Sequence, residues 1–450
     1  MTAAAPLTLL SAIVFAVVAI AAAWIARRRS WSAPAMIVAS APFAWYHQLG
    51  PTEITISKSA FVGAVIGIVW TLAADRDRRA RAIVALRGSR ALLPLVALAL
   101  WSALSVFWAG TPDDAVRDAL KWVWYAGVFA LTAVSIEEPA DGMKVLVAMF
   151  VTAAVVALDG LWQNATSAPA GFVAPGGAVV GRIAGTLEGP NQFGAYLVSA
   201  ICPLLAVALF ARLSGAATAA VSLLLGLLGA DLVFTYSRGA LWSCAVAVSA
   251  IAIAYVRSRR AGSPLPLAVP AAFVVGVVLI FVPVAHSAVG LSGWEHELLT
   301  PTASDTVDSA QRRVQLWTCA VELFAHHPVA GVGAGNFADS KEACGSALAG
   351  AEHFNANEWY LETAADLGTV GVAVLAAFLF ALLSAGRVAQ VWRDPVALGA
   401  YAVLIAFVLH GFVDDVMAYP KAALSFFVLT AMLPRPPSRR GETGRPRRPG

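Results

Sequence analysis

The sequence has little charge for its length. Charged residues make up 13% of its 450 residues, hydrophobic residues make up 59%, and the mean hydropathy is +0.74. Soluble domains carry about 25% charged residues, so this composition excludes an ordinary soluble enzyme. Uncharged stretches of about 20 residues, long enough to cross a bilayer as helices, follow one another along the chain. The composition therefore predicts an integral membrane protein with many spans.

Thirteen apolar segments are separated by short polar joints. They are residues 6–26, 33–49, 57–74, 91–109, 116–135, 143–161, 191–211, 215–235, 239–256, 265–286, 359–386, 395–413 and 420–434. The first has no basic residue before its apolar stretch, so we expect a retained helix instead of a cleaved signal. The last is short. We therefore expect an all-α protein of about 12–13 transmembrane helices.

Lysine and arginine are divided unevenly between the two sides of these spans. If residue 1 lies outside, most basic joints fall on the inner side, as the positive-inside rule requires. This orientation predicts four parts, which are transmembrane helices 1–10 in residues 1–286, a large periplasmic loop in 287–358, transmembrane helices 11–13 in 359–434, and a basic, disordered cytoplasmic tail in 435–450.

The net charge is only +4, and most basic residues are explained as topology signals. We therefore expect membrane lipids as neighbours and no nucleic-acid partner. The four cysteines show no metal-ligand spacing, and we expect no metal and no other cofactor. Cys319 and Cys344 share the large loop, where an oxidising compartment would permit a disulfide. The sequence leaves that pairing open.

The large loop contains one clear amphipathic pattern. Between Asp308 and Phe324, the residues Val314, Trp317 and Val321 recur with Phe324 at helical spacing. We expect a helix that lies at the membrane surface on this apolar stripe. Glycines at positions 331, 333 and 335 follow it and predict a tight turn.

Several arginines collect on the predicted outer face. They are Arg182, Arg238, Arg312 and Arg313. Guanidinium groups bind phosphate in bidentate fashion, so one interpretation is a site for the phosphate head of a lipid carrier. In the other interpretation, Arg238 reaches the interface and pairs with Asp231, while Arg312 and Arg313 face lipid headgroups.

Four stretches, taken together, resemble the O-antigen ligase and O-antigen polymerase superfamily of bacterial membrane glycosyltransferases. They are Gly185 to Asn191 with Arg182 upstream, Thr235 to Gly239, Arg313 and Trp317 followed by His327 to Gly333, and Tyr360 to Glu362 followed by Asp366 to Gly371. Their order, and the large loop between them, match the family's arrangement.

The resemblance implies an enzyme that transfers a glycan from an undecaprenyl-pyrophosphate-linked donor to lipid A core or another saccharide acceptor. The reaction would occur at the periplasmic face of the bacterial inner membrane without a metal. Arg238 and Arg313 would stabilise the leaving pyrophosphate, with Arg312 and Arg182 assisting. Asn191 and Asn357 can hydrogen-bond sugar hydroxyls. From their position at the outer mouth between the final spans, and not from the resemblance, Asp414 and Lys421 are also expected to contact sugars.

The sequence departs from the family at one position that matters. Family ligases carry a His-Asn pair before the Tyr-Leu dipeptide, where this chain has Asn357 and Glu358. An amide cannot accept a proton from a hydroxyl at neutral pH. We expect Glu358 or His353 to serve as the base, unless Glu358 only pairs with Arg238 or Arg313.

Other functions remain open at this point. Within the superfamily, the chain is a ligase, a polymerase that joins repeat units on carriers, or an enzyme that transfers to protein. From another class, a lipid-linked glycan transporter or flippase would fit the many spans. Transport needs polar residues along the whole depth of the bilayer, whereas here they collect at one face, which favours the enzyme.

Overall fold

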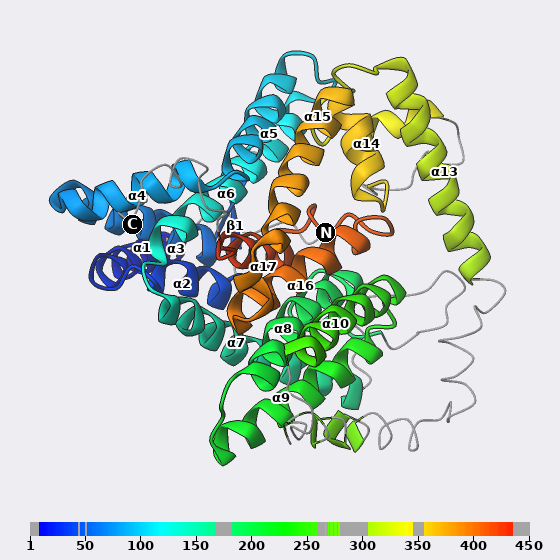
Figure 1. Ribbon diagram of the computed structural model, residues 1–450. Helices are drawn as coiled ribbons and strands as arrows, with labels where there is room; N and C mark the ends of the chain where they lie inside the picture. Colours follow the sequence, from blue (N-terminus) through cyan, green and yellow to red (C-terminus); the bar gives the residue numbers. More distant parts are fainter. Residues whose placement is uncertain are drawn as a thin grey trace, which may run out of the picture.

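The computed structural model describes most of the chain (Figure 1). Described are residues 9–43, 46–49, 52–166, 182–258, 305–344 and 355–434, together with isolated residues between 266 and 279. His353, most of the predicted span 265–286 and the tail 435–450 lie outside this range.

The described chain is almost entirely helical. The helices of 19 or more residues are α1 (Leu9–Arg28), α3 (Ile56–Ala74), α6 (Pro112–Ser135), α7 (Pro139–Thr166), α8 (Pro190–Phe210), α9 (Gly215–Phe234), α10 (Arg238–Ser258), α13 (Asp305–His326) and α15 (Trp359–Leu383). Shorter ones are α2 (Ser32–Ser40), α4 (Arg76–Gly88), α5 (Leu92–Leu104), α14 (Phe337–Ser340), α16 (Pro395–His410) and α17 (Pro420–Ala431). Four 3-10 turns are η1 (Ser105–Phe107), η2 (Lys341–Cys344), η3 (Ser384–Arg387) and η4 (Ala389–Trp392).

Among the described helices, seven are long and apolar enough to cross a membrane, namely α1, α3, α7, α8, α9, α10 and α15. The pair α4 and α5 passes the same test together but bends by 76° between its two parts. The helices α16 and α17 are apolar but shorter. This architecture confirms the predicted all-α, multi-pass membrane protein, although the described helices that meet this test are fewer than the predicted 12–13.

The predicted span 33–49 is wrong as a single helix. Helix α2 ends at Ser40, and β1 (Tyr46–Leu49) then pairs with β2 (Thr52–Thr55) in an antiparallel hairpin. Thr52, Ile54 and Thr55 are β-branched, which favours a strand, and Tyr46 is paired with Thr55 across the hairpin. Average hydropathy cannot distinguish such a hairpin from the end of a helix.

Helix α8 forms the centre of the bundle. Its apolar window is 83% buried, the highest value among the candidate spans in the described chain, and it packs against α9, α10, α16 and α17. A Cβ atom at Gly399 of α16 would lie 2.4 Å from the Pro203 Cα atom of α8. The two backbones therefore approach more closely than any side chain at position 399 would allow.

Helices α1 and α3 pair at the side of the bundle through two glycines one turn apart. Cβ atoms added at Gly63 and Gly67 would lie 2.0 Å and 2.3 Å from the carbonyl oxygens of Ala19 and Ala23. Small residues four positions apart allow membrane helices to pack backbone against backbone. This contact fixes the first two long helices against each other.

The bundle has two chemically different ends. We call one end the polar mouth: the amino ends of α8, α10, α15 and α17, the carboxyl end of α16, and the connecting segment 411–419. The other, the arginine-rich end, holds α4 and the carboxyl ends of α1, α3, α10 and α15. Figure 1 shows α4 at the left of the molecule, away from α8, α9 and α10.

Candidate active site

The segment between α16 and α17 lies at the centre of the polar mouth. The Trp359 backbone N–H, at the start of α15, donates a hydrogen bond to the Gly411 carbonyl oxygen (2.8 Å). Arg313 Nη1, from α13, donates to the Val413 carbonyl oxygen (3.1 Å). A Cβ atom at Gly239 of α10 would lie 2.7 Å from the Val413 side chain. Helices distant in sequence therefore meet around residues 411–413.

A chain of polar contacts crosses this mouth from Arg182 to Asp414. Arg182 Nε donates to the Thr235 carbonyl oxygen (2.9 Å) and Arg182 Nη2 donates to Asn191 Oδ1 (3.1 Å). The Asn191 side chain in turn donates to the Asp414 carboxylate, and the charges of Arg313 and Arg182 act on the same carboxylate. The structure thus brings together four residues that the sequence singled out.

Asp414 is a buried carboxyl group, with 4% of the residue exposed. Burial raises its pKa above the usual range, because the charged form is poorly solvated. The charge of Arg313 and the hydrogen bond from Asn191 oppose this rise. Asp414 is therefore an acceptor beside two guanidinium groups, shielded from bulk water.

Asp415 faces another group of charges. Its Oδ1 accepts hydrogen bonds from the backbone N–H groups of Met417 (3.0 Å) and Ala418 (3.2 Å). Burial raises the pKa of Asp415 to about 6, with Lys121 opposing the rise and Asp414 adding to it. Lys121 of α6 also forms an ion pair with Asp118. The sequence did not point to the pair on α6, although opposite charges three residues apart in an apolar helix are a signal that such a pair faces protein.

Lys421 occupies the edge of the mouth. Its Nζ forms an ion pair with the Glu188 carboxylate (3.1 Å) and donates to the Thr186 carbonyl oxygen (3.1 Å). The first residues of α17 are thereby linked to the segment that precedes α8. Any anion that Lys421 receives would compete with Glu188.

Arg238 faces outward. It is the first residue of α10, and its side chain is exposed. Trp242, Val246 and Ile253 on the same helix face are also exposed, by 74%, 47% and 53%. The alternative pairing with Asp231 is wrong, because Asp231 is fully buried and its carboxylate oxygens have no hydrogen-bond partner within the described part of the chain.

Glu358 has a structural contact that the sequence did not predict. It is the N-cap residue of α15, where its Oε2 accepts a hydrogen bond from the Leu361 N–H, and this satisfies a donor left free at the helix start. Burial raises the pKa of Glu358, and the N–H groups of Leu361 and Tyr360 oppose that rise. In the described chain no ion pair joins Glu358 to Arg238 or Arg313, so that alternative is wrong.

Asn357 shapes the backbone before this cap. Its φ angle is 50°, in the left-handed region that asparagine tolerates better than most residues. Its side-chain amide and backbone N–H both donate to Asn355, at 3.5 Å and 3.3 Å. The position of His353 and the side chain of Arg312 lie outside the described residues.

The glycine-rich turn after α13 docks onto a break in α15. The backbone N–H groups of Val332 and Gly333 donate to the carbonyl oxygens of Ala365 and Asp366 (both 2.9 Å). Gly368 interrupts the α15 helix with a φ of 65°. A Cβ atom there would lie 2.3 Å from the Val329 carbonyl oxygen. The glycines are therefore required by backbone packing.

The carboxylate of Asp366 holds the same turn. Its two oxygens accept hydrogen bonds from the N–H groups of Gly335 (2.7 Å) and Phe337 (2.8 Å). These amide groups of the predicted tight turn are thus bound within the protein. This contact fixes the carboxyl end of α13 relative to α15.

Helix α13 forms where it was predicted, and it packs against protein through the face opposite the predicted stripe. Leu316, Cys319 and Ala320 are each 1% exposed, whereas Val314 and Val321 of the predicted stripe are 57% and 52% exposed. Because α13 packs against α15, its inner face is occupied by protein. The predicted stripe points away from the rest of the protein, where a membrane surface could meet it, and Figure 1 shows α13 along the right edge of the molecule.

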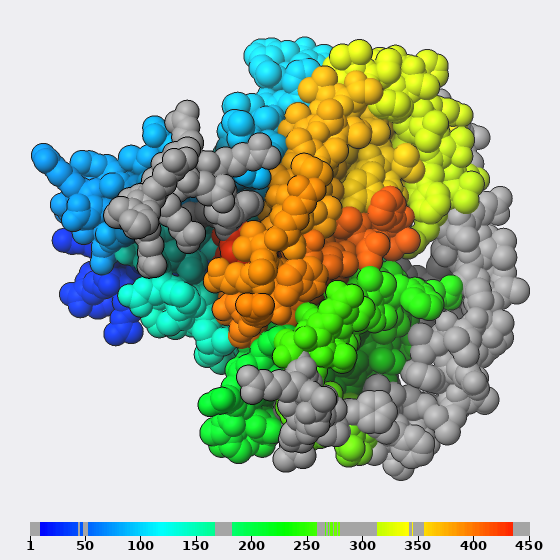
Figure 2. Space-filling view, in the orientation of Figure 1, coloured from blue at the N-terminus to red at the C-terminus, as the bar shows by residue number. Residues whose placement is uncertain are grey.

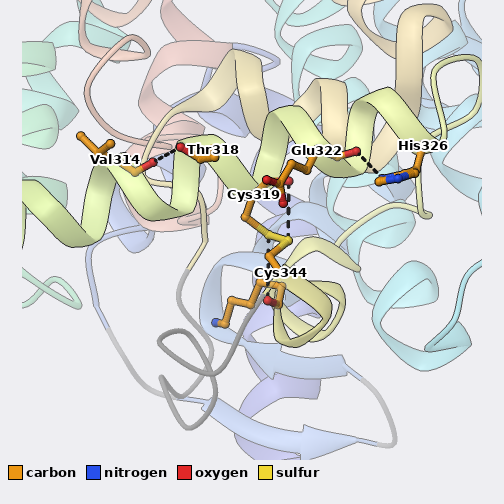
Figure 3. The surroundings of a disulfide bond; sticks show 7 residues. Val314, Thr318, Cys319, Glu322, His326 and Cys344 are labelled. Atoms are coloured by element: carbon orange, nitrogen blue, oxygen red, sulfur yellow. Dashed lines mark hydrogen bonds between the residues drawn. A yellow bond between two sulfur atoms is a disulfide. The ribbon is translucent and has the colours of Figure 1, made fainter.

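A disulfide joins Cys319 of α13 to Cys344 at the end of η2 (Figure 3). The Cα atoms are 5.5 Å apart. The pairing that the sequence left open is therefore present. It ties α13, which carries Arg313, to the segment that follows α14.

In the described part of the chain, no group of three or more histidine, cysteine, aspartate or glutamate side chains is arranged to hold a metal ion. The acidic residues of the mouth are bound instead by backbone N–H groups, amides and cations, as for Asp414, Asp415 and Asp366.

The family model of the O-antigen ligases matches residues 222–376. No curated protein matches the chain. The matched range contains Arg238, Arg313 and Glu358 but ends before Asp414, and it begins after Asn191. It also contains the glycine-rich turn and the break in α15. The match supports the resemblance to the O-antigen ligase and polymerase superfamily seen in the sequence, over residues 222–376 of this chain.

Proposed function

We propose that this protein transfers a glycan from an undecaprenyl-pyrophosphate carrier to a hydroxyl group of a saccharide, at the periplasmic face of the bacterial inner membrane. The contact chain from Arg182 through Asn191 to Asp414, with Arg313 beside it, is the observation that carries this proposal. It gathers cations and a proton acceptor at one end of an apolar bundle.

Arg313 and Arg182 are assigned to the leaving group. In the transfer, an acceptor oxygen forms a bond to the anomeric carbon of the donor sugar. The bond from that carbon to the pyrophosphate oxygen breaks, and its electron pair leaves with the pyrophosphate. Fixed guanidinium groups in a poorly hydrated site stabilise this charge as it develops. Arg312 is retained as an assisting residue on α13.

Arg238 is assigned to the first contact with the carrier. Its exposed side chain stands at the end of the lipid-facing face of α10, above Trp242 and Val246. An anionic lipid that diffuses within the bilayer would meet this guanidinium at headgroup depth. Lys421, Asn191 and Asn357 are assigned to the hydrogen-bonding groups of the sugars and the pyrophosphate.

Asp414 suits the role of base better than Glu358 does. The acceptor hydroxyl must lose its proton as the new bond forms, and a carboxylate with a raised pKa accepts protons well near neutral pH. Glu358 uses an oxygen to cap α15, whereas Asp414 lies beside Arg313. His353 remains a second candidate that we place in the same role.

The test is an assay with purified full-length protein, an undecaprenyl-pyrophosphate oligosaccharide and lipid A core, in the presence of EDTA. We expect the glycan to move to lipid A core and the pyrophosphate carrier to be released. Growth of chains on the carrier, with lipid A core unmodified, would assign the protein as a polymerase of the same superfamily. Absence of transfer to lipid A core, to carrier-linked acceptors and to protein, with folded enzyme, would overturn the proposal and favour a transporter.

A further inference from the structure

Helix α4 is fixed crosswise at the arginine-rich end. One residue, Asp75, separates it from α3, and the Asp75 side chain caps its start by accepting hydrogen bonds from the N–H groups of Asp77 (2.9 Å) and Arg78 (3.0 Å). At its other end α4 meets α5 at 76°. Both neighbours are apolar helices of the bundle. If they cross the bilayer, α4 is therefore held at the membrane surface.

The helix and its C-terminal turn carry more positive charge than their neighbours neutralise. Arg78 and Arg81 lie near Glu137, at 3.9 Å and 3.3 Å. Four further arginines are exposed and form no ion pair with the described residues, namely Arg76, Arg79, Arg87 and Arg90. Asp77 is the remaining acidic side chain in this helix. The surface therefore has several cations available for an anionic partner.

The exposed cations are interleaved with apolar side chains. Ile83 and Val84 are 43% and 70% exposed, while Ala82 is buried against the bundle. At 100° per residue, Arg76, Arg79 and Arg87 fall on the same helix face as Ile83 and Val84. A face with both arginine and aliphatic residues, on a helix bent by 76° from the apolar helix that follows it, would match the headgroup layer: the aliphatic groups would enter the acyl boundary and the guanidinium groups would reach phosphates.

Arginine and tryptophan side chains at the carboxyl ends of α1 and α3 indicate where the membrane interface lies next to α4. Arg27 lies 5.0 Å from the ring of Trp70, and Arg28 lies 4.0 Å from the ring of Trp24. Both tryptophans are more than half exposed, at 58% and 57%. Exposed tryptophan beside arginine is typical of the membrane interface, and α3, which carries Trp70, runs directly into α4. Figure 2 shows α4 projecting from the left side of the molecule.

From these observations we infer that α4 is a binding site for anionic phospholipid headgroups. The ligand class is a phosphate-bearing lipid with net negative charge, bound by Arg76, Arg79 and Arg87 together with Arg90. An acidic protein or a nucleic acid would satisfy the charges but would leave Ile83 and Val84 in water. The site is at the opposite end from the polar mouth and does not depend on the proposed transfer reaction.

The test uses the full-length protein in nanodiscs that mix phosphatidylglycerol with phosphatidylcholine. The fraction of phosphatidylglycerol retained in the first lipid shell is measured by native mass spectrometry. A variant with Arg76→Gln, Arg79→Gln, Arg87→Gln and Arg90→Gln is compared with a control that has Arg212→Gln, Arg257→Gln, Arg387→Gln and Arg393→Gln, four arginines exposed in the structure.

We expect the α4 variant to lose at least about tenfold in selectivity for phosphatidylglycerol, since four basic residues at one headgroup site are removed together. The control removes the same charge from separate segments of the same end, without a shared face of exposed aliphatic residues, and should lose less. Val84→Asp, with all arginines kept, should also weaken retention, because it opposes insertion of the helix face. Equal losses in the two arginine variants, or no loss in the α4 variant, would overturn the inference. So would displacement of the lipid by an acidic peptide.

Discussion

The hydrogen-bonded arginines of the polar mouth and the exposed arginines of the opposite end have different environments. At the polar mouth, Arg182 and Arg313 are half-buried and donate to backbone and side-chain oxygens. At the arginine-rich end, Arg76, Arg79 and Arg87 are exposed and unpaired in the described structure. The buried arginines have fixed geometry, which suits a site that stabilises one charge distribution. The exposed ones suit a fluid ligand such as a lipid surface.

The largest expected difference in transfer rate is between variants of the two carboxyl groups that are candidates for the base, Asp414 and Glu358. Asp414→Asn should lower the transfer rate by at least about 100-fold, because a general base typically contributes that much or more. Glu358→Gln should lower it by less than about tenfold, since glutamine keeps an oxygen to cap α15. Initial rates of glycan transfer measure both, with thermal unfolding as the folding control. The reverse order would return the role to Glu358.

The two faces of α13 give the next largest contrast, this time in stability. Leu316→Asp should lower the free energy of unfolding by about 3 kcal/mol, because it buries an unpaired charge. Val321→Asp on the exposed face should change it by no more than about 0.5 kcal/mol. The unfolding midpoints of the two variants in detergent are the measurement. Similar midpoints would mean that α13 does not pack on α15 through its Leu316 face.

Because the pKa values of acidic residues at the polar mouth are raised, we expect stability to fall and activity to rise as pH increases. Burial raises the pKa of Asp415 to about 6, above the unfolded value of about 3.9. The folded state therefore binds more protons than the unfolded state in this window, and stability should fall as pH rises from about 4 to about 6. Asp414, whose pKa is also raised, must be ionised to accept a proton, so activity should rise with pH.

Parallel pH series of unfolding midpoints and transfer rates would check this. Asp415→Asn should flatten the stability curve, and if wild type and this variant share the same curve, Asp415 is not the group responsible.

The ion pairs of the arginine-rich end give the smallest expected effect. Glu137 lies 3.3 Å from Arg81 and 3.9 Å from Arg78 at a solvent-accessible surface. Exposed pairs contribute about 0–1 kcal/mol, so Glu137→Gln should change the free energy of unfolding by no more than that. Chemical denaturation at low and high salt measures it. A loss as large as that of Leu316→Asp would show that this end is also held by specific polar contacts.

The parts of the fold that depend on local hydropathy could be predicted from the sequence. Long apolar stretches such as residues 191–211 and 215–235 became α8 and α9. The hairpin after α2 could not be predicted in this way, because pairing between Tyr46 and Thr55 is a contact between two segments. The residues by which α13 packs on α15, such as Leu316, could not be predicted for the same reason, because they depend on a contact between two segments.

The site was partly predictable for a different reason. Residue type suggested Arg182, Arg313, Asn191 and Asp414, and the fold brings them together. Residue type could not show that Glu358 would cap a helix. It also could not show that Lys121 lies near Asp415, which is nearly 300 residues later in the chain. Such roles depend on where helix ends meet.

The central claim is that the arginines of the polar mouth perform the transfer chemistry and those of the opposite end do not. The most direct test compares transfer from an undecaprenyl-pyrophosphate oligosaccharide by the wild type, Arg313→Ala, Arg182→Ala and Arg393→Ala in the same nanodiscs. We predict that Arg313→Ala loses about 100- to 1,000-fold in rate, that Arg182→Ala also loses activity, and that Arg393→Ala retains wild-type activity. Equal rates in all four folded proteins would contradict the account.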